Sequence, residues 1–332
     1  MPQLRALAFT LAAVVATSAA GQSLPRFGAP EKHVDAELIA ATDAIVPGHP
    51  LTVGLRLKHE NEWHTYWQVP GDSGLPTQIK WQLPAGFNAG PIAWPHPKRL
   101  PVGPLMNFGY EGETLLLTTV QVPADLPAGT PVTLHAKASW LECKDVCIPG
   151  DAQVKLTLPV KPQAAPSSSA ALFKAAQARV PTSSLTASAS IDGYRIRVAV
   201  SPPAGKTLDK FEFFPLEEGR IEAAAPQALK SEGGQSAIYL TAAKPIAPDF
   251  KTLKGVVVAN GGPAYANGWA SIVQAPLSAG AVGAAAGATS AAGAGWRCRH
   301  GRNPTRCAGR CSARSKQPAA NGRDRRSSSP EA

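Results

Sequence analysis

Two cysteines four residues apart, Cys143 and Cys147, are the residues of this chain best suited to chemistry. They lie in the stretch S-W-L-E-C-K-D-V-C-I-P-G, which covers residues 139–150. Such a pair can alternate between two thiols and a disulfide, because a thiolate attacks a disulfide sulfur and the second cysteine resolves the mixed disulfide. This exchange needs no cofactor and no acid–base dyad. The sequence offers no serine triad, dyad or phosphate-binding loop that indicates another reaction.

The flanking pattern predicts how the two cysteines meet. Apolar and polar residues alternate over residues 132–140 and again over 154–160, as in half-buried strands. On one straight strand the two Cα atoms would lie roughly 13 Å apart, whereas a disulfide needs about 4.4–6.8 Å. We therefore expect two strands joined by a turn at residues 144–146, with the cysteines facing each other. A bridge across so short a loop stabilises the fold only weakly, which is typical of an exchanging disulfide.

The region from about residue 33 to 160 predicts a β scaffold around this pair. Seven segments have the alternation of short strands and are separated by turns rich in proline and glycine: 34–41, 51–57, 63–69, 78–83, 114–122, 130–140 and 153–160. About seven short strands in such a length favour an antiparallel β-sandwich. Its aromatic residues are expected mainly to fill the core. The alternative is that some of them line the cysteine site: Trp63, Tyr66, Trp67 and Trp140.

Three segments carry a resemblance to a known family: W-L-E-C-K-D-V-C-I-P at 140–149, W-H-T-Y-W-Q-V-P-G-D-S-G-L-P-T at 63–77 and N-F-G-Y-E at 107–111. They are similar to the N-terminal periplasmic domain of DsbD-type thiol:disulfide interchange proteins, in particular the ScsB-like branch with a C-x3-C pair. The resemblance covers residues 30–160 well and 170–275 more loosely. It implies an all-β, immunoglobulin-like sandwich whose Cys143–Cys147 disulfide takes electrons from a membrane reductase domain. The better-known members have a longer gap between the cysteines.

The resemblance also implies partners and a cap. The partners would be periplasmic thioredoxin-like or disulfide isomerase proteins, and the activity would be that of a protein-disulfide reductase component. In the family, a loop with an aromatic residue covers the cysteines until a partner arrives. Residues 91–113 predict a long functional loop rich in proline and glycine, and by position Phe108 or Tyr110 corresponds to the cap. Alternatively, both side chains pack at the edge of the sandwich.

The remaining segments predict an exported protein with two β domains. Residues 1–20, with Arg5 and an apolar run, predict a secretory signal and hence a periplasmic location; family members are anchored in the inner membrane. Residues 161–170 have the composition of a linker. A short helix at 170–179 and a second, smaller β-rich domain over 171–277 are expected to follow, with five strands: 185–190, 194–201, 210–214, 236–241 and 253–259.

Residues 278–332 form a low-complexity, arginine-rich tail that we expect to be disordered or the product of a frameshift. The tail accounts for most of the formal net charge of +10, so the charge says little about the folded part. Export argues against a nucleic-acid partner. The tail cysteines match no zinc motif that we can justify. The sequence has no apolar run long enough for the family's membrane domain, which would therefore be a separate partner.

Two other readings of the candidate residues compete with exchange. His59 and His64 lie in H-E-N-E-W-H, one residue too long for the zinc-protease helix motif, so no metal site or cofactor is expected. The chain could instead be a binding or structural module, with a fixed disulfide or with a Cu(I) site that uses a nearby histidine. Beside the pair, Lys144 would favour a thiolate, whereas Glu142 and Asp145 would oppose it. The nucleophilic cysteine therefore stays open.

Overall fold

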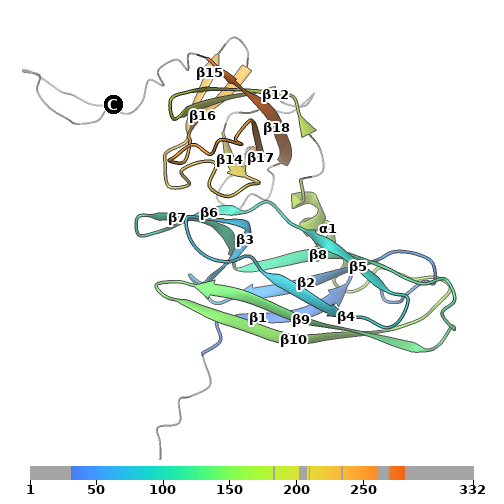
Figure 1. The fold of residues 1–332 in the computed structure, drawn as a ribbon. Helices are drawn as coiled ribbons and strands as arrows, with labels where there is room; N and C mark the ends of the chain where they lie inside the picture. The colour runs from blue at the N-terminus through green and yellow to red at the C-terminus, as the bar shows by residue number, and fades with distance from the viewer. Residues whose placement is uncertain are drawn as a thin grey trace, which may run out of the picture. The chain divides into compact units, whose positions relative to one another are not determined.

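The computed structural model describes residues 31–181, 184–201, 208, 210–232, 235–259 and 269–280. The expected secretory signal and the tail beyond residue 280 lie outside the described residues. Apart from helix α1, the elements of the described part are β-strands (Figure 1). The prediction of an all-β fold is thus confirmed.

A four-stranded antiparallel sheet forms the first layer of the sandwich, in the order β1-β2-β8-β5. Its strands are β1 (Val34–Ala40), β2 (Leu51–His59), β5 (Asn88–Ala93) and β8 (Glu113–Gln121). Directly opposite residues such as Leu55 and Leu116 are fully buried, because both side chains point from the same face into the core. The leucine-rich alternation of β2 and β8 thus creates the apolar face that the second layer covers.

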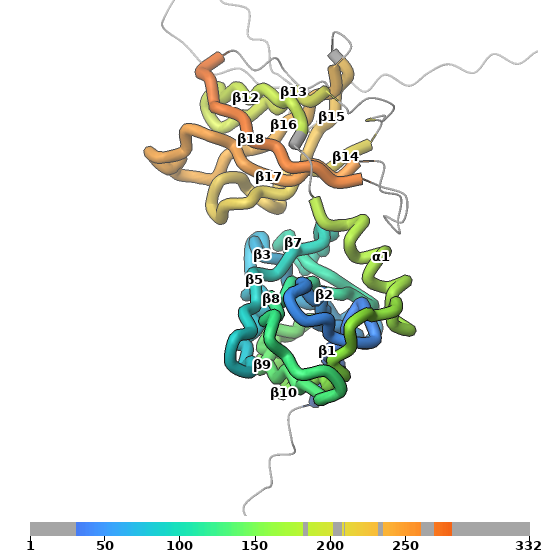
Figure 2. The backbone as a smooth tube through the Cα atoms, turned by 90° about the vertical axis from the view of Figure 1, so that its right-hand side faces the viewer, coloured from blue at the N-terminus to red at the C-terminus, as the bar shows by residue number. Residues whose placement is uncertain are grey.

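The second layer is a six-stranded sheet in the order β10-β9-β3-β7-β6, with β4 also paired to β9. Its strands are β3 (His64–Gly71), β4 (Gln78–Gln82), β6 (Lys98–Val102), β7 (Leu105–Glu111), β9 (Pro131–Cys143) and β10 (Cys147–Pro159). Strands β9 and β10 form one long antiparallel hairpin, and Figures 1 and 2 show the two strands side by side. Residues from both layers share one core, among them Leu38, Trp67, Leu134 and Trp140.

Strands β9 and β10 both reach the cysteines, beyond the bounds that alternation predicted. The apolar–polar pattern is interrupted in this stretch by Pro149 and Gly150, but neither residue breaks the pairing. Strand β10 is at the edge of the sheet, where a missing proline N–H can be tolerated. Gly150 lies against the indole of Trp140, which a Cβ atom would approach to 2.4 Å. The glycine therefore marks a close packing contact between the two strands of the hairpin.

The prediction of a long loop over residues 91–113 is wrong. This segment contains the end of β5, the hairpin of β6 and β7, and the first residue of β8. Its prolines and glycines read as loop signals, but they mark a tight turn and an edge strand. Gly103 has a φ of +56° in the turn between β6 and β7, and Pro101 lies in β6 at the edge of the sheet.

A third sheet follows helix α1 (Ala170–Arg179), which packs Phe173 and Ala176 against Leu115 and Leu117 of β8. The sheet order is β14-β17-β18-β12-β13-β16-β15, with β11 also paired to β18. The bounds are β11 (Ser184–Leu185), β12 (Ala187–Asp192), β13 (Arg195–Val200), β14 (Phe211–Pro215), β15 (Ala228–Glu232), β16 (Gln235–Thr241), β17 (Thr252–Ala259) and β18 (Trp269–Ala279). Strands β15 and β18 were not predicted, and β18 extends past residue 277 into the predicted tail.

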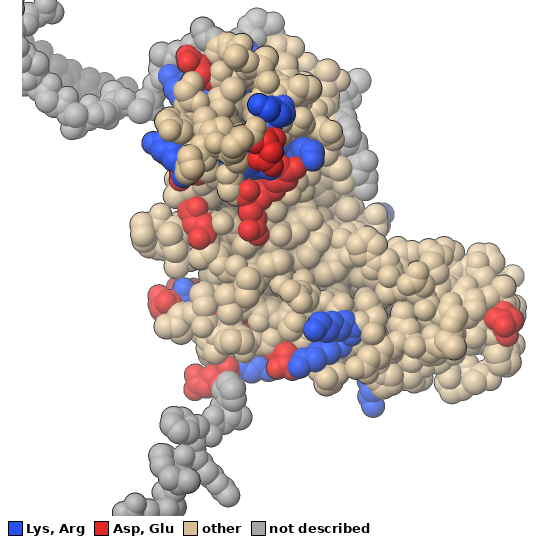
Figure 3. Space-filling view, in the orientation of Figure 1, with Lys and Arg blue, Asp and Glu red and all other residues tan. Residues whose placement is uncertain are grey.

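Charged side chains are few on the face that Figure 3 shows, and their signs are mixed. On this face, lysine and arginine lie interspersed with aspartate and glutamate. Arg56, for example, lies 2.7 Å from Glu37 and 2.9 Å from Glu113. Among the described residues, no helix is both long and apolar enough to cross a membrane.

Candidate functional site

The β9–β10 hairpin places Cys143 and Cys147 opposite each other at its tip, where they form a disulfide. The two Cα atoms lie 4.2 Å apart. The turn consists of residues 144–146, as the alternation predicts, and the Lys144 N–H donates to the Val146 carbonyl at 3.2 Å. An antiparallel register with directly opposed cysteines is what lets a pair four residues apart bridge.

The two cysteines differ in their access to solvent. Cys143 is 1% exposed, whereas Cys147 is an exposed residue at the first position of β10. An attacking thiolate needs an open approach to the sulfur that it attacks. Cys147 is therefore the accessible sulfur of the pair, and Cys143 is the protected one.

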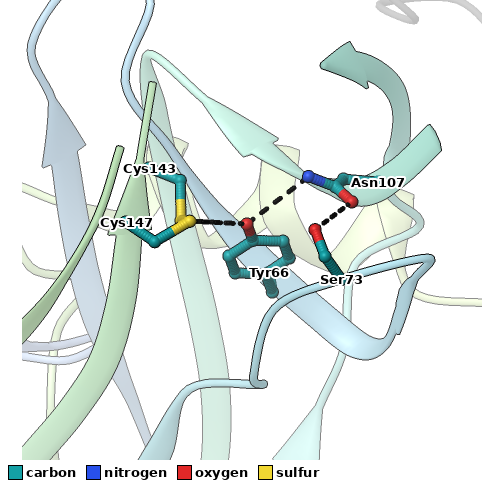
Figure 4. The surroundings of a disulfide bond; sticks show 5 residues. All are labelled: Tyr66, Ser73, Asn107, Cys143 and Cys147. Atoms are coloured by element: carbon teal, nitrogen blue, oxygen red, sulfur yellow. Dashed lines mark hydrogen bonds between the residues drawn. A yellow bond between two sulfur atoms is a disulfide. The ribbon is translucent and has the colours of Figure 1, made fainter. Parts of the chain in front are cut away.

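Tyr66 of β3 lies against both sulfurs (Figure 4). Its hydroxyl donates a hydrogen bond to Cys143 Sγ at 2.9 Å and lies 3.6 Å from Cys147 Sγ. Burial raises the pKa of Tyr66, so the phenol keeps its proton at neutral pH. A donor aimed at sulfur stabilises a thiolate more than a thiol, because hydrogen bonds to charged acceptors are stronger. The site can thus hold a negative charge on Cys143.

Two further side chains orient this phenol. Asn107 Nδ2 donates to the Tyr66 hydroxyl at 3.4 Å, and Ser73 Oγ donates to Asn107 Oδ1 at 2.9 Å (Figure 4). Because the hydroxyl oxygen accepts from Asn107, its own hydrogen is left to point toward Cys143. The series of hydrogen bonds from Ser73 through Asn107 and Tyr66 to Cys143 therefore fixes the direction in which the Tyr66 hydroxyl donates.

The loop that follows β3 holds Tyr66 in place from the other side. Gly74 has a φ of +102°, and a Cβ atom there would lie 2.2 Å from a carbon of the Tyr66 ring. Asp72 fastens this loop to β7: its N–H donates to the Met106 carbonyl, and its Oδ2 accepts from the Met106 N–H at 2.8 Å. Only glycine combines this backbone conformation with so close an approach to the ring.

Four directly opposed residues on neighbouring strands form a row on the face of the sheet that carries the two sulfurs. His64 of β3 pairs with Cys143 of β9 on one side and with Glu111 of β7 on the other. Directly opposed residues share a face, so Glu111, His64, Cys143 and Cys147 follow one another across β7, β3, β9 and β10. His64 is 3% exposed, and its ring meets Tyr66 edge-on at 5.2 Å between centroids. Burial lowers the pKa of His64, so the ring is neutral at pH 7.

A pocket of about 340 Å³ opens beside this row. It is lined by His64, Leu100, Glu111 and residues of the hairpin tip, Lys144 and Asp145. The pocket therefore connects the buried histidine with the surface next to the disulfide.

Residues 35–159 match the family model described as "Thiol:disulfide interchange protein DsbD, N-terminal". This segment is a DsbD-type N-terminal domain. No curated protein matches the chain.

Solved structures show the fold of the DsbD-type domain and its continuation. The crystal structure of the N-terminal periplasmic domain of ScsB from Proteus mirabilis has a TM-score of 0.56 and 18% identity, and the match covers 78% of this chain and 97% of that one. A protein of unknown function from Porphyromonas gingivalis W83 has a TM-score of 0.21 and 12% identity, with 72% and 99% covered. The major pilin subunit BcpA* of Bacillus cereus has 0.24 and 10%, with 68% and 58% covered. The likeness to the ScsB domain supports a shared fold.

Two of the charged residues beside the cysteines of the DsbD-type domain, Lys144 and Glu142, have other partners. Lys144 Nζ lies 2.7 Å from Glu62, and this contact raises the pKa of Lys144 and lowers that of Glu62. Glu142 is buried and accepts hydrogen bonds from the Trp140 indole at 2.9 Å and the His33 N–H at 3.2 Å. Since adjacent residues of a strand point to opposite faces, Glu142 lies away from the Cys143 sulfur.

Of the aromatic residues predicted to line or cap the site, Tyr66 is the one whose hydrogen bond to sulfur is present among the described residues. Trp67 and Trp140 lie in the core, and Trp63 stacks on His33 at 3.7 Å. Phe108 and Tyr110 alternate with the residues of β7 that face the sulfurs, so they point to the opposite face.

Both residues predicted as the cap are fully buried. Phe108 is part of the sandwich core with 0% exposure, and the Tyr110 hydroxyl donates to the Pro95 carbonyl at 2.6 Å. Their capping role stays a prediction, and the register of β7 gives it no support.

Sequence reasoning did not assign the residues that support Tyr66. Ser73, Gly74, Asn107 and Glu111 were noted only within the segments that carry the resemblance. His64 was considered only as a zinc ligand. The signal that finds His64, Asn107 and Glu111 is strand register, which brings residues from β3, β7 and β9 onto one face.

Proposed function

We propose that this chain is a periplasmic thiol–disulfide exchange protein, in which the Cys143–Cys147 disulfide relays electrons from a membrane reductase domain to periplasmic proteins. The observation that carries the proposal is the asymmetry of the pair: one exposed cysteine, and one buried cysteine whose sulfur accepts a hydrogen bond from Tyr66. The match of residues 35–159 to the DsbD N-terminal family supports it.

Reduction of the pair begins at the exposed sulfur. A thiolate of the electron donor attacks Cys147 Sγ, the disulfide breaks, and its electron pair leaves on Cys143. The Tyr66 hydroxyl stabilises this thiolate until it takes up a proton. The donor's second thiolate then attacks the donor's first sulfur in the mixed disulfide. This releases Cys147 as a thiolate, which is protonated from solvent. The donor ends as a disulfide, and the pair ends as two thiols.

Delivery to a periplasmic protein runs through the same two sulfurs in reverse. The Cys147 thiolate attacks the partner's disulfide, and one partner sulfur leaves as a thiolate. Cys143 then attacks Cys147 Sγ, which re-forms the Cys143–Cys147 disulfide and frees the partner's second thiolate. Thioredoxin-like or disulfide isomerase proteins are the partners in this proposal.

The proposal also assigns the parts of the chain. Residues 30–160 are the redox domain, and residues 171–277 are a second β-rich domain that acts as a spacer or docking module. The periplasmic location rests on the predicted secretory signal together with the family match. A membrane reductase domain is the electron donor in this proposal.

The first test combines a potential with trapping. Equilibration of the pair with glutathione or dithiothreitol buffers, read by alkylation and mass shift, should give a reduction potential above about −300 mV. The variant Cys143→Ser should accumulate a mixed disulfide with partners through Cys147, while Cys147→Ser, whose remaining thiol is buried, should trap none. The tail cysteines are replaced by serine in both variants.

The competing function is that of a binding or structural module with a fixed disulfide or a Cu(I) site. A potential well below about −300 mV would identify the bridge as structural. Trapping by Cys147→Ser in preference to Cys143→Ser would contradict the assignment of the accessible sulfur.

A further inference from the structure

The row of side chains beside the disulfide contains a polar atom that takes no part in the exchange steps described above. His64 Nε2 is buried and has no hydrogen-bond partner among the described residues. A buried polar atom without a partner is unfavourable by about 1–3 kcal/mol, so native proteins seldom retain one without a role. The atom belongs to the residue that pairs directly with Cys143, the protected cysteine.

The closing step of the exchange includes a proton transfer at this place. Cys143 must lose its thiol proton before it can attack Cys147 Sγ in a mixed disulfide. Burial in general disfavours the charged thiolate, so a buried thiol supplies little of it unaided. Tyr66 stabilises the thiolate but cannot take the proton, because its own hydroxyl is protonated.

We propose that His64 is the catalytic base that accepts the proton of the Cys143 thiol as the reduced pair closes onto a mixed disulfide. The inference rests on the proposed exchange function. In this step the S–H bond of Cys143 breaks and an N–H bond forms on His64. The Cys143 thiolate bonds to Cys147 Sγ, and the electron pair of the bond to the partner leaves on the partner's sulfur. The proton passes from His64 to that thiolate by way of solvent.

The charged and titratable groups around His64 fit this role. Tyr66 flanks the ring on β3, Glu111 faces it from β7, and Lys144 and Asp145 of the hairpin tip line the same pocket. Burial lowers the pKa of His64 and Glu111 opposes this effect, so the ring is a neutral acceptor at pH 7 and its cation would have a carboxylate neighbour. His59, on β2, opposes a positive charge on His64 only when the His59 ring is itself protonated. Burial lowers the pKa of His59 to about 4, so this ring is neutral at pH 7.

The pocket gives the proton a way out. Its volume of about 340 Å³ exceeds the roughly 10–15 Å³ that one water molecule needs by more than tenfold. The acidic residues that line the pocket are Glu62, Glu111 and Asp145; Glu62 lies 2.7 Å from Lys144 Nζ and Glu111 lies 3.5 Å from Lys98 Nζ. Water in the pocket can therefore return the proton to the departing thiolate.

The test follows the two halves of the reaction separately. The full chain, with Cys298, Cys307 and Cys311 replaced by serine, is reduced and mixed with one equivalent of 4,4′-dithiodipyridine in a stopped-flow spectrometer between pH 6 and 9. A first thiopyridone is released when Cys147 attacks the probe, and a second when Cys143 closes the disulfide. His64→Gln is compared with His96→Gln, a matched control because His96 is also buried but lies outside the row.

In His64→Gln the second phase should slow by about 10- to 100-fold at pH 7, since general bases contribute at least that much in many enzymes. The first phase should not change, and His96→Gln should match the parent in both phases. The second phase of the parent should be nearly independent of pH between 6.5 and 8, whereas that of His64→Gln should rise about tenfold per pH unit, as expected for unassisted thiol ionisation.

An unchanged second phase in folded His64→Gln would overturn the proposal. If that variant fails to fold, the pH dependence of the parent protein tests the proposal. A rate of the second phase that rises about tenfold per pH unit from pH 6 to 8 overturns the proposal, and a rate that does not change with pH supports it. Failure of the exchange function looks different, because then the parent itself would release no second thiopyridone at any pH.

Discussion

At the scale of single residues, the phenol of Tyr66 is the group on which the site depends most directly. Its hydrogen bond to Cys143 at 2.9 Å acts on the sulfur that must carry charge during exchange. Hydrogen bonds to charged groups contribute roughly 1.5–3 kcal/mol. Tyr66→Phe keeps the ring but removes the donor, so the Cys143 thiolate should be about 10- to 100-fold less populated at neutral pH. Thiolate absorbance near 240 nm, followed against pH in the reduced protein, measures this change.

The matched control for this variant is Tyr110→Phe. Tyr110 is also a buried phenol, but its hydroxyl donates to the Pro95 carbonyl and lies on the other face of the sheet. The Tyr110→Phe variant should lose some stability without a change in the titration of the thiols. Equal thiol titrations in the two variants would show that the Tyr66 hydroxyl does not act on the sulfur.

At the scale of elements, the loop after β3 positions the phenol, and Gly74 decides its path. Gly74→Ala places a methyl group within 2.2 Å of the Tyr66 ring at a φ of +102°, so either the loop or the phenol must move. We expect a loss of about 1–3 kcal/mol in the free energy of unfolding, together with a slower closing of the disulfide. Urea denaturation and the two-phase thiopyridone assay measure the two effects.

Gly103→Ala is the control for backbone conformation alone. Gly103 has a φ of +56°, but no atom lies within 4 Å of a Cβ built there. It should lose roughly 1–2 kcal/mol of stability from the left-handed conformation and keep the parent's closing rate. If Gly103→Ala slowed closing as much as Gly74→Ala, contact with Tyr66 would not be the cause.

The elements also show which parts of the fold the sequence could predict. The β9–β10 hairpin was predictable because alternation on both sides of the cysteines leaves only one way to bring them together. The β6–β7 hairpin was not, because Gly103 and Pro101 are turn and edge-strand residues that also occur in loops. The neighbours of Cys143 were hardest to predict. His64 faces it through a register between strands far apart in sequence, which local patterns do not encode.

At the scale of the whole molecule, buried histidines couple folding to pH. Burial lowers the pKa of His59 to about 4, and burial together with the charge of Arg179 lowers that of His96 to about 4. In the unfolded chain a histidine has a pKa of about 6.5. Between these values the unfolded state binds protons that the folded state does not, so the free energy of unfolding falls as the pH decreases.

We therefore expect stability to be lost between about pH 6.5 and pH 4, with each of these two histidines contributing up to about 3 kcal/mol. Urea denaturation at pH 7, 5.5 and 4.5 measures the loss, and His96→Gln should reduce it because glutamine does not titrate. The salt-bridged carboxyl of Asp249, whose pKa is lowered to about 2 by Arg220, titrates below this window and does not confuse the result. Equal stability at pH 7 and 4.5 would mean that both histidines become accessible to protons in the folded state, and their burial would then have to be transient in solution.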